Sequence, residues 1–542
     1  MKFLQFQKPQ RYIGNEWNVI KKLHFRKIKI CLCYPDIYEI GMSNLGIRII
    51  YGLLNKQRDI LCERAFLPGW DLIKYLKETK QPLFSLESKT PLNHFEVIGF
   101  QLSQELNFIN FLTMLELGKI PLKAEERRNI IVVGGGIANP EPLADFIDLF
   151  FLGEFEAASS NFTEILSKYK NKEDRLKALA EKEGFYVPKF YSSTSGNLEK
   201  KYPYAKLPIK RVYAKDLNNT FYPEKWLTPH IQIIHDRPQI EISRGCPNHC
   251  NFCQARAIYH PYRERKAEIV TRYIQNIYKN SGYGDLTLLS LSASDYSQIE
   301  ELIDSNYDFL KKKSIGLSLP SLRIDDIFSK IYKKFSSLKK THLTVALEAA
   351  RDASRQKLNK KIDPNKLLEM AKMLRKEGLQ RLKIYFMFGL PEETDEDLIA
   401  IGKFLKILSQ NSKLFITVSI NPFMPKPFSI WEDMLMSSEK KLLDKKDIIL
   451  RNIDQKKYIK VSVSPIQKSI LETIISRADR NFSKVIYKVY LQISKLSVYE
   501  EDYHWNLWKK VMEEEKIDYE SYLGMDSSIY PWSFIKTDMI CR

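Results

Sequence analysis

The stretch SRGCPNHCNFCQAR, residues 243–256, places Cys246, Cys250 and Cys253 within eight positions. The chain has seven cysteines in 542 residues, which is too few for a disulfide framework and fits a reducing compartment. A structural zinc site usually takes four ligands in two separated pairs. A [4Fe–4S] cluster usually takes four cysteines. With three thiolates one iron keeps an open coordination position, so the spacing favours a reactive cluster, with zinc as the alternative.

The cysteines open a series of six strand patterns separated by helical patterns, which predicts a partial (β/α)6 barrel over residues 237–435. The working face of such a barrel lies at the C-terminal ends of its strands. The six strand patterns are PQIEISRG, LTLLSLSASD, SIGLSLPSLR, THLTVALEAA, LQRLKIYFMFGLP and LFITVSINPF.

The region before the barrel, residues 1–185, also alternates short apolar runs with helical patterns, so we expect an α/β fold with a doubly wound, Rossmann-like parallel sheet. Its strand patterns are KIKICLCYPD, FEVIGFQL, NIIVVGGG and LFFLGE. Ligands of such sheets bind beyond the carboxyl ends of the strands. Those ends carry Asp36, Gly41, Gly134, Gly135, Gly136, Gly153 and Glu154.

Two further regions complete the chain: a connector at 186–236, rich in proline and aromatic residues, and a mostly helical C-terminal region at 436–542. The first residues contain no apolar h-region, and no apolar run reaches the length of a membrane span. We therefore expect a cytoplasmic protein without a membrane partner.

The net charge of +19 permits an anionic partner such as RNA. The lysine-rich stretch Lys440–Lys460, with Arg477 and Arg480 beyond it, is a candidate RNA surface. A compositional excess of lysine on solvated helix faces explains the same charge without a binding surface.

The spacing C-x3-C-x2-C after the first strand, with Phe252 before the last cysteine, resembles the radical S-adenosylmethionine (radical SAM) superfamily. The resemblance implies that Cys246, Cys250 and Cys253 bind a [4Fe–4S] cluster whose fourth iron is chelated by S-adenosylmethionine. It implies reductive cleavage of that cofactor to a 5′-deoxyadenosyl radical, which abstracts hydrogen from a substrate. It also implies a reductant such as flavodoxin or ferredoxin.

The resemblance extends to the other strand ends, and it implies that residues there bind the cofactor. Glu348 and Arg323 could instead form a structural ion pair inside the barrel. The implied cofactor-binding residues are Phe252, Ser292, Ser294, Asp295, Arg323, Glu348, Gly389, Pro391 and Asn421.

The first region resembles the cobalamin-binding domain that many members of this superfamily carry before the barrel. The hallmark of that domain is D-x-H-x-x-G, and this chain reads Asp36-Ile37-Tyr38-Glu39-Ile40-Gly41. Tyr38 stands where the cobalt-binding histidine is expected. Cobalamin, if bound, is held without a protein histidine on cobalt, or the domain has lost the cofactor. The triple glycine Gly134–Gly136 and the loop at Gly153 and Glu154 complete the implied cobalamin contacts.

Longer stretches are similar to one cobalamin-domain family of largely unassigned reaction. Its members are often fused to, or accompanied by, a second small domain of unknown function, so the resemblance implies a separate small companion protein as a candidate partner. The stretches are NEWN, YPDIYEIGMSNLGIRIIY, FSLESKTPL, GGGIANPEPLADF, HDRPQIEISRGC, LPSLR and IYPWSFIKTD. Arg256, His260 and Ala350 depart from the family pattern, which puts details of the substrate pocket in doubt.

Three functions remain open. The first is a radical SAM enzyme that modifies an unactivated C–H position, with RNA as one candidate substrate. The second is a methyl- or methylthio-transferase acting on a protein or small molecule. A methylthiotransferase usually carries a second set of three cysteines in its first domain, and Cys31, Cys33 and Cys62 lack the expected spacing. The third is a non-enzymatic RNA-binding protein whose cysteines hold a structural metal site.

Overall fold

The computed structural model describes residues 3–194, 197–319, 343–376, 378–453, 458–494, 504–525 and 530–538. The chain divides into two compact units. Unit 1 contains Met1–Asp236 together with Ile474–Tyr519 and Ser527–Asp538. Unit 2 contains Arg237–Thr473 with Glu520–Asp526.

Unit 1 is built on a six-stranded sheet of order β2-β1-β3-β4-β5-β6. The first five strands in this order run parallel, and β6 is antiparallel to β5. The doubly wound sheet expected from the strand–helix alternation is therefore confirmed. The strands are β1 (Ile28–Tyr34), β2 (Ile60–Phe66), β3 (Val97–Gln101), β4 (Ile131–Gly135), β5 (Leu149–Phe151) and β6 (Phe185–Tyr186).

The strand β2 was missed by the sequence analysis. Its sequence, ILCERAF, carries Glu63 and Arg64 at its centre, which hides the apolar pattern of a strand. All seven of its residues are buried. The charges are tolerated because partners from other segments neutralise them, which no local pattern reports.

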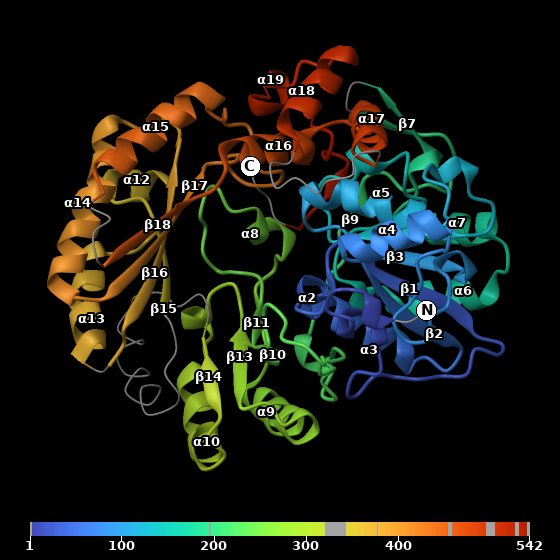
Figure 1. The fold of residues 1–542 in the computed structure, drawn as a ribbon, viewed down its shortest axis with the longest axis horizontal. Helices are drawn as coiled ribbons and strands as arrows, with labels where there is room; N and C mark the ends of the chain where they lie inside the picture. Colours follow the sequence, from blue (N-terminus) through green and yellow to red (C-terminus); the bar gives the residue numbers. More distant parts are fainter. Residues whose placement is uncertain are drawn as a thin grey trace. The chain divides into compact units, whose positions relative to one another are not determined.

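The helices of unit 1 lie around its sheet (Figure 1). Asn44 caps the start of α3, where its side chain accepts a hydrogen bond from the backbone N–H of Ile47 at 3.0 Å. The helices are α1 (Gln10–Ile13), α2 (Tyr38–Gly41), α3 (Leu45–Lys56), α4 (Trp70–Thr79), α5 (Phe108–Leu117), α6 (Ser159–Lys168) and α7 (Lys172–Ala180).

The connector contains more regular structure than its sequence suggested. The strands β7 (Tyr191–Thr194) and β8 (Asn197–Lys200) form an antiparallel pair. The strand β9 (Ile209–Lys210) pairs in parallel with β19 (Ile535–Lys536), which lies near the end of the chain. The IYPWSFIKTD stretch therefore belongs to unit 1.

Unit 2 contains two parallel sheets, with strand orders β10-β13-β14 and β15-β16-β17-β18. The six strands predicted from the sequence are present among the described residues. They are β10 (Gln239–Glu241), β13 (Asp285–Leu289), β14 (Gly316–Ser318), β15 (Leu343–Glu348), β16 (Arg381–Phe388) and β17 (Phe415–Pro422). A short antiparallel pair, β11 (Ser243–Arg244) with β12 (Arg263–Glu264), flanks the cysteine loop.

The helices of unit 2 alternate with these strands, as the periodicity predicted. They are α8 (Gln254–Ile258), α9 (Ala267–Ser281), α10 (Ile299–Lys312), α12 (Asp352–Lys357), α13 (Pro364–Lys376), α14 (Asp395–Ser412) and α15 (Glu439–Arg451).

The C-terminal region, expected to be a helical segment of its own, divides between the two units. It also contributes β18 (Ile459–Val463), which extends the second sheet of unit 2 in parallel with β17. In β18 the exposed Lys460 and Ser462 alternate with apolar residues, so only part of the strand's surface is buried. The helices of this region are α16 (Ile466–Arg477), α17 (Ser483–Ile493), α18 (Trp505–Glu514) and α19 (Glu520–Leu523).

Candidate functional site

The cysteine loop lies between β11 and α8 in unit 2, and its thiols remain partly exposed. The backbone N–H of Cys253 donates to the carbonyl of Cys250 at 3.2 Å, which closes a tight turn. Cys253 then serves as the residue before the first turn of α8. Three soft sulfur donors on one short loop are the donor set that iron–sulfur clusters use.

The thiols lie near one another and near charged side chains. Burial raises the pKa of Cys250, the positive charge of Lys360 lowers it, and the thiols of Cys253 and Cys246 raise it. Burial also raises the pKa of Cys253. In the part of the chain that is described, no three His, Cys, Asp or Glu side chains converge on a single metal ion. A cluster makes a different demand, because each thiolate binds a different iron of the cluster.

Two segments from elsewhere in unit 2 hold the cysteine loop. In the turn after α12, the carbonyl of Leu358 accepts from the backbone N–H of Asn251 at 3.1 Å. The side chain of Asn359 donates to the carbonyl of His249 at 2.8 Å. From the segment after β17, the N–H of Trp431 donates to the carbonyl of Asn251 at 3.0 Å. The backbone of the loop is therefore fixed by contacts on two sides.

Phe252 lies partly buried against an apolar cluster at the ends of β15, β16 and β17. The buried members of that cluster are Ala349, Leu358, Leu390 and Phe423, and Met387, Trp431 and Met434 pack beside them. The aromatic residue of the cysteine motif thus anchors the loop on its apolar side. Its predicted contact with a cofactor stays a prediction.

Asp295 follows β13 and contacts the cysteine loop directly. Its carboxylate oxygen Oδ2 accepts hydrogen bonds from Asn248 Nδ2 and from Ser292 Oγ, each at 2.6 Å. Asn248 Nδ2 also lies 3.5 Å from the sulfur of Cys246. Ser292 and Ser294 are buried. Asn248 was missed by the sequence analysis, and its only signal was a polar residue between the first two cysteines.

Glu348 ends β15 in a backbone conformation that side-chain-bearing residues rarely adopt, with φ +67°. It is 9% exposed, and burial raises its pKa while Lys360 lowers it. Lys360 Nζ lies 3.7 Å from the Glu348 carboxylate. Strained backbone and a buried ionisable group at a strand end are typical of functional sites.

The remaining predicted residues of unit 2 lie at strand ends but contact the protein itself. Gly389 has φ +73°, and a Cβ there would come within 2.6 Å of Leu442. Its N–H donates to Glu393 at 2.7 Å. Asn421 accepts from Ser464 Oγ at 2.5 Å, and Pro391 is partly buried. Arg323 lies outside the described residues.

In unit 1, Tyr38 points into the protein. It lies in α2, is 2% exposed, and its hydroxyl donates to Glu16 Oε1 at 3.1 Å. Its ring packs edge-on against Phe66, with centroids 5.3 Å apart. Nearby, Gly41 permits close packing, because a Cβ there would come within 2.3 Å of the Phe66 ring. Tyr38 therefore does not offer a side chain to cobalt.

Most of the other residues predicted to contact cobalamin serve the packing of unit 1. A Cβ on Gly134 would come within 2.8 Å of Ile147, and one on Gly136 within 2.4 Å of Gln101. A Cβ on Gly135 would meet no atom closely, since the nearest, the carbonyl oxygen of Phe151, would be 4.0 Å away. Asp36 accepts a hydrogen bond from the N–H of the next residue, Ile37, at 2.7 Å.

Gly153 and Glu154 contact the connector. Gly153 has φ +134°, and a Cβ there would lie 2.1 Å from the carbonyl oxygen of Val212. The N–H of Glu154 donates to that carbonyl at 2.8 Å. The Glu154 carboxylate accepts from the N–H of Ala214 at 2.9 Å. The predicted contacts of these residues with cobalamin stay a prediction.

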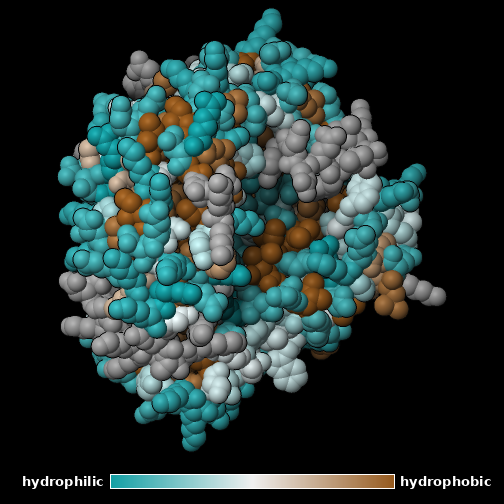
Figure 2. Space-filling view, turned by 60° about the vertical axis from the view of Figure 1, so that its left-hand side comes forward, coloured by the Kyte–Doolittle hydropathy of each residue, from teal (hydrophilic) through white to brown (hydrophobic). Residues whose placement is uncertain are grey.

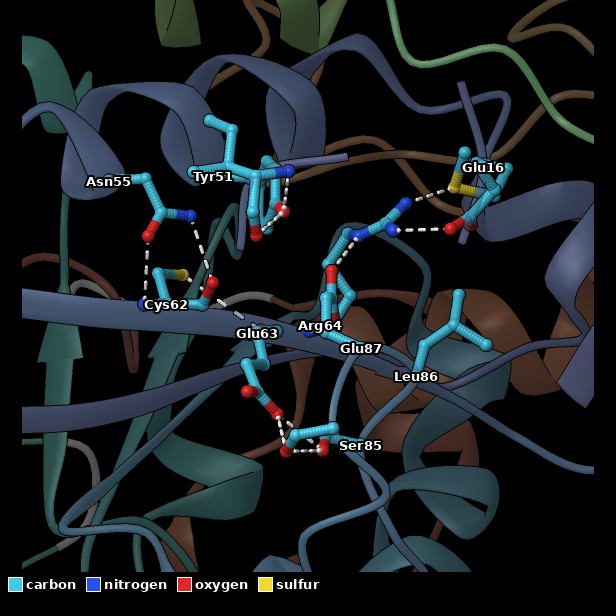
Figure 3. A network of polar contacts seen from close by, with 12 residues as sticks. Glu16, Tyr51, Asn55, Cys62, Glu63, Arg64, Ser85, Leu86 and Glu87 are labelled. Carbon is cyan, nitrogen blue, oxygen red and sulfur yellow. Dashed lines mark hydrogen bonds and ion pairs between the residues drawn. The ribbon is translucent and has the colours of Figure 1, made fainter. Parts of the chain in front are cut away.

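Several of the longer motifs meet instead in a buried network around Arg64 (Figure 3). Arg64 has no exposed side-chain surface and pairs with Glu16 at 3.0 Å and with Glu87 at 2.7 Å. Glu16 comes from NEWN and Glu87 from FSLESKTPL. Burial alone would raise the pKa of Glu16, but Arg64 and Tyr38 outweigh it and lower that pKa. The motifs therefore encode the interior of unit 1.

A second motif, GGGIANPEPLADF, binds the C-terminal segment of unit 1. The Asn139 side chain donates to the carbonyls of Ser476 and Ala478, at 3.2 and 2.8 Å. Arg480 forms an ion pair with Glu141 at 3.1 Å. This motif is thus accounted for by structure as well.

Cys31, Cys33 and Cys62 are fully buried within β1 and β2. Burial raises the pKa of Cys31 and of Cys62 well above the ordinary value. Their surroundings are core side chains, as expected for structural thiols. They do not resemble a second cluster site.

The candidate RNA surface is wrong in part. Arg477 is fully buried, and Arg480 is engaged with Glu141. Lys445 pairs with the buried carboxylate of Glu393 at 2.8 Å. Lys440 and Lys441 stay exposed on α15. On the face shown in Figure 2 hydrophilic residues predominate, interrupted by apolar patches.

Two sequence profiles of one superfamily match the chain, each in a different unit. The profile described as "Radical SAM proteins, N-terminal" matches residues 46–188, and the profile described as "Radical SAM superfamily" matches residues 240–405. The second match contains the cysteine loop and most of the strand ends described above. The chain belongs to the radical SAM superfamily. It is accordingly an enzyme of that superfamily, as the cysteine motif predicted.

Relatives of this radical SAM chain include one that aligns with most of it and one that aligns with about a third of it. An uncharacterized protein of Methanocaldococcus jannaschii is 28% identical over 470 residues, covering 86% of this chain and 91% of that one. The ribosomal protein methylthiotransferase RimO of Thermoanaerobacter is 24% identical over 176 residues, covering 31% of this chain and 40% of that one.

The fold of the chain is similar to that of a solved radical SAM protein. The radical S-adenosylmethionine methyltransferase TsrM from Kitasatospora setae, solved with cobalamin and a [4Fe–4S] cluster, has a TM-score of 0.54 at 11% identity. The match covers 90% of this chain and 99% of that one. The likeness confirms the predicted architecture, a Rossmann-like domain followed by a radical SAM barrel. No helix among the described residues is long and apolar enough to span a membrane.

Proposed function

We propose that this enzyme holds a [4Fe–4S] cluster through Cys246, Cys250 and Cys253 and modifies an unactivated C–H position of its substrate. The observation that carries the proposal is the cysteine loop itself: three partly exposed cysteines on a loop whose backbone is fixed by hydrogen bonds from the turn after α12 and from the segment after β17. When bound, the cluster supplies one electron that cleaves S-adenosylmethionine into methionine and a 5′-deoxyadenosyl radical, which takes a hydrogen atom from the substrate. The electron comes from a flavodoxin- or ferredoxin-type reductant.

The residues around the loop perform the tasks that the chemistry leaves to the protein. Phe252 and its apolar cluster keep water from one side of the loop. Lys360 and Glu348 supply a charged pair next to Cys250, where a polar cofactor group can be bound. The hydrogen bonds from Asn359 and Trp431 hold the loop in one conformation.

No step of the proposal is assigned to cobalamin. A solved protein of the same fold binds it. In this chain Tyr38 is buried against Glu16, so a bound cobalamin would be held without a protein side chain from position 38 on cobalt.

The test is anaerobic reconstitution with iron and sulfide. About four irons should bind per chain, and the spin-resonance signal of the reduced cluster should change when S-adenosylmethionine is added. Alanine at Cys246, Cys250 or Cys253 should abolish both results. Cys33→Ala is the matched control, because it removes a thiol from β1 and should leave the iron content unchanged. One zinc per chain without labile sulfide would overturn the proposal.

A methyl- or methylthio-transferase is the second candidate, because curated relatives with that activity align with about a third of the chain. Those relatives include the tRNA-2-methylthio-N(6)-dimethylallyladenosine synthase of Clostridium perfringens, which is 25% identical over 170 residues. The burial of Cys31, Cys33 and Cys62 opposes a second cluster in unit 1. An iron content near eight per reconstituted chain, as two clusters demand, would favour this candidate.

RNA is the substrate class that the net charge of +19 supports. Binding of transfer or ribosomal RNA fragments should weaken as salt rises, with a slope of roughly −0.7 to −0.9 per phosphate contact. Glutamine at Lys440 and Lys441 should reduce the slope. Glutamine at Lys445 should not, because that side chain already pairs with Glu393. Weak binding shared by any polyanion and unchanged by these substitutions would leave a small molecule or a protein as substrate.

A further inference from the structure

Asn248 joins two groups that the sequence analysis treated separately, the cluster thiol of Cys246 and the strand-end carboxylate of Asp295. Its amide nitrogen lies 3.5 Å from the sulfur and 2.6 Å from the carboxylate. A primary amide has two N–H bonds in one plane, pointing in different directions. One N–H can therefore meet the carboxylate while the other meets the sulfur. The longer distance suits sulfur, whose radius exceeds that of oxygen.

The carboxylate fixes the orientation of this amide. Asp295 Oδ2 also accepts from Ser292 Oγ at 2.6 Å, and the Asp295 carbonyl lies 2.9 Å from the hydroxyl of Tyr262. Ser292 is buried, and burial raises the pKa of Tyr262. Asp295 is thus held by neighbours on its own loop and on the segment after the cysteine loop. A carboxylate held in this way accepts from the nitrogen of Asn248 and repels its oxygen, which turns the second N–H toward the thiol.

We propose that Asn248, positioned by Asp295, donates a hydrogen bond to the Cys246 sulfur and thereby raises the reduction potential of the cluster. Hydrogen bonds to cluster sulfurs are one of the features that set this potential. The reduced cluster carries one more negative charge than the oxidised cluster, so a donor to its thiolate stabilises the reduced form more. The inference rests on the proposed function, because it requires a cluster on Cys246.

This assignment differs from the one that the resemblance implied for Asp295. The resemblance implied that Asp295 contacts S-adenosylmethionine. In the present proposal its carboxylate orients Asn248, whose amide lies next to the sulfur of Cys246. The two assignments separate experimentally, because one acts on the cofactor's affinity and the other on the potential of the cluster before the cofactor binds.

The experiment is a potentiometric titration of the reconstituted cluster without S-adenosylmethionine, in wild type, Asn248→Leu and Asn251→Leu. Asn248→Leu removes the amide at nearly constant volume. It should shift the midpoint to a more negative value by about 59 mV, which is a tenfold change in a one-electron equilibrium. Asn251→Leu is the matched control, because Asn251 lies on the same loop and donates to the Lys357 carbonyl. Its midpoint should equal that of the wild type.

Asn248→Ala provides a second variant in case leucine prevents cluster assembly, and it should shift the midpoint in the same direction. An unchanged midpoint in an Asn248 variant that carries about four irons would overturn the inference and leave the proposed function intact. Absence of any cluster from the wild type would overturn both. An Asp295→Asn variant that loses tenfold or more in S-adenosylmethionine affinity, while the Asn248 variants keep the wild-type midpoint, would restore the cofactor-binding assignment.

Discussion

The network around Arg64 in unit 1 and the cysteine loop in unit 2 use similar materials for opposite purposes. Both gather charged and sulfur-bearing side chains from segments far apart in the sequence. Around Arg64 the side chains are buried and ion-paired with one another. In the cysteine loop the thiols stay partly exposed, and the hydrogen bonds fix the backbone around them. Buried polar side chains that pair with one another stabilise a fold. Side chains on a loop that is fixed through its backbone can instead bind a ligand.

The largest effect on stability should come from removing the centre of the closed network. Arg64→Leu leaves Glu16 and Glu87 buried without their cation, and losing one partner of a buried ion pair costs about 3–5 kcal/mol. Hydrogen exchange of the β1 and β2 amides should report this loss. Lys189→Ala is the control, because its pair with Glu173 is exposed and surface pairs contribute about 1 kcal/mol or less. Equal losses of stability in Arg64→Leu and Lys189→Ala would contradict the stabilising role assigned to the buried network around Arg64.

A second large effect should come from Gly153→Ala, where the connector meets the sheet. The added Cβ would lie 2.1 Å from the Val212 carbonyl, at φ +134°, so we expect a loss of about 3 kcal/mol from strain and displacement. Gly282→Ala has φ +71° with no atom within 4 Å of the added Cβ, and should lose about 1 kcal/mol. Thermal unfolding of both variants measures the difference, and a smaller loss at Gly153 would show that the connector moves freely.

A moderate effect should follow from Tyr38→Phe, which removes one hydrogen bond to Glu16 and keeps the ring against Phe66. Hydrogen bonds to charged groups contribute about 1.5–3 kcal/mol. Because Arg64 still pairs with Glu16, we expect the free energy of unfolding of unit 1 to fall by the lower of these values.

The inward orientation of the side chain at position 38 can also be tested by spectroscopy, with Tyr38→His. A histidine at position 38 faces Glu16 and Phe66, so cobalamin added to this variant should not acquire a histidine-ligated absorption spectrum. The appearance of that spectrum would show that position 38 reaches a cofactor and that its burial is not fixed.

The smallest effect should be a change in pH dependence at Glu348. Burial raises its pKa above 4.5, so the folded protein keeps this proton at pH values where the unfolded chain has lost it. Stability should then fall as pH rises from 4.5 through the raised pKa, because ionisation costs the folded state more. Glu348→Gln should remove this part of the decline in thermal unfolding of the cluster-free protein. Glu392→Gln, which alters an exposed carboxylate paired with Lys357, should keep the decline.

Much of the architecture was predictable, because strands and helices are encoded by local periodicity. The alternation along KIKICLCYPD and the three residues Cys246, Cys250 and Cys253 were sufficient to predict a parallel sheet and a superfamily. The strand and helix periodicities and the cysteine spacing do not change when one polar residue replaces another elsewhere in the chain. The sequence by itself therefore determined the order of elements, the class of fold and the cysteine set.

The tertiary structure alone decided which polar residues serve the fold and which surround the thiols. Glu16 and Arg64 are 48 positions apart, and their pairing makes β2 a buried strand despite its charges. The same pairing turns Tyr38 inward, although its motif resembled a cobalt-ligand motif. Asn248 and Asp295 are 47 positions apart, and their contact was equally invisible along the chain. The free energy of a buried polar group depends on the partner that folding brings to it, and a partner distant in sequence leaves no local signal.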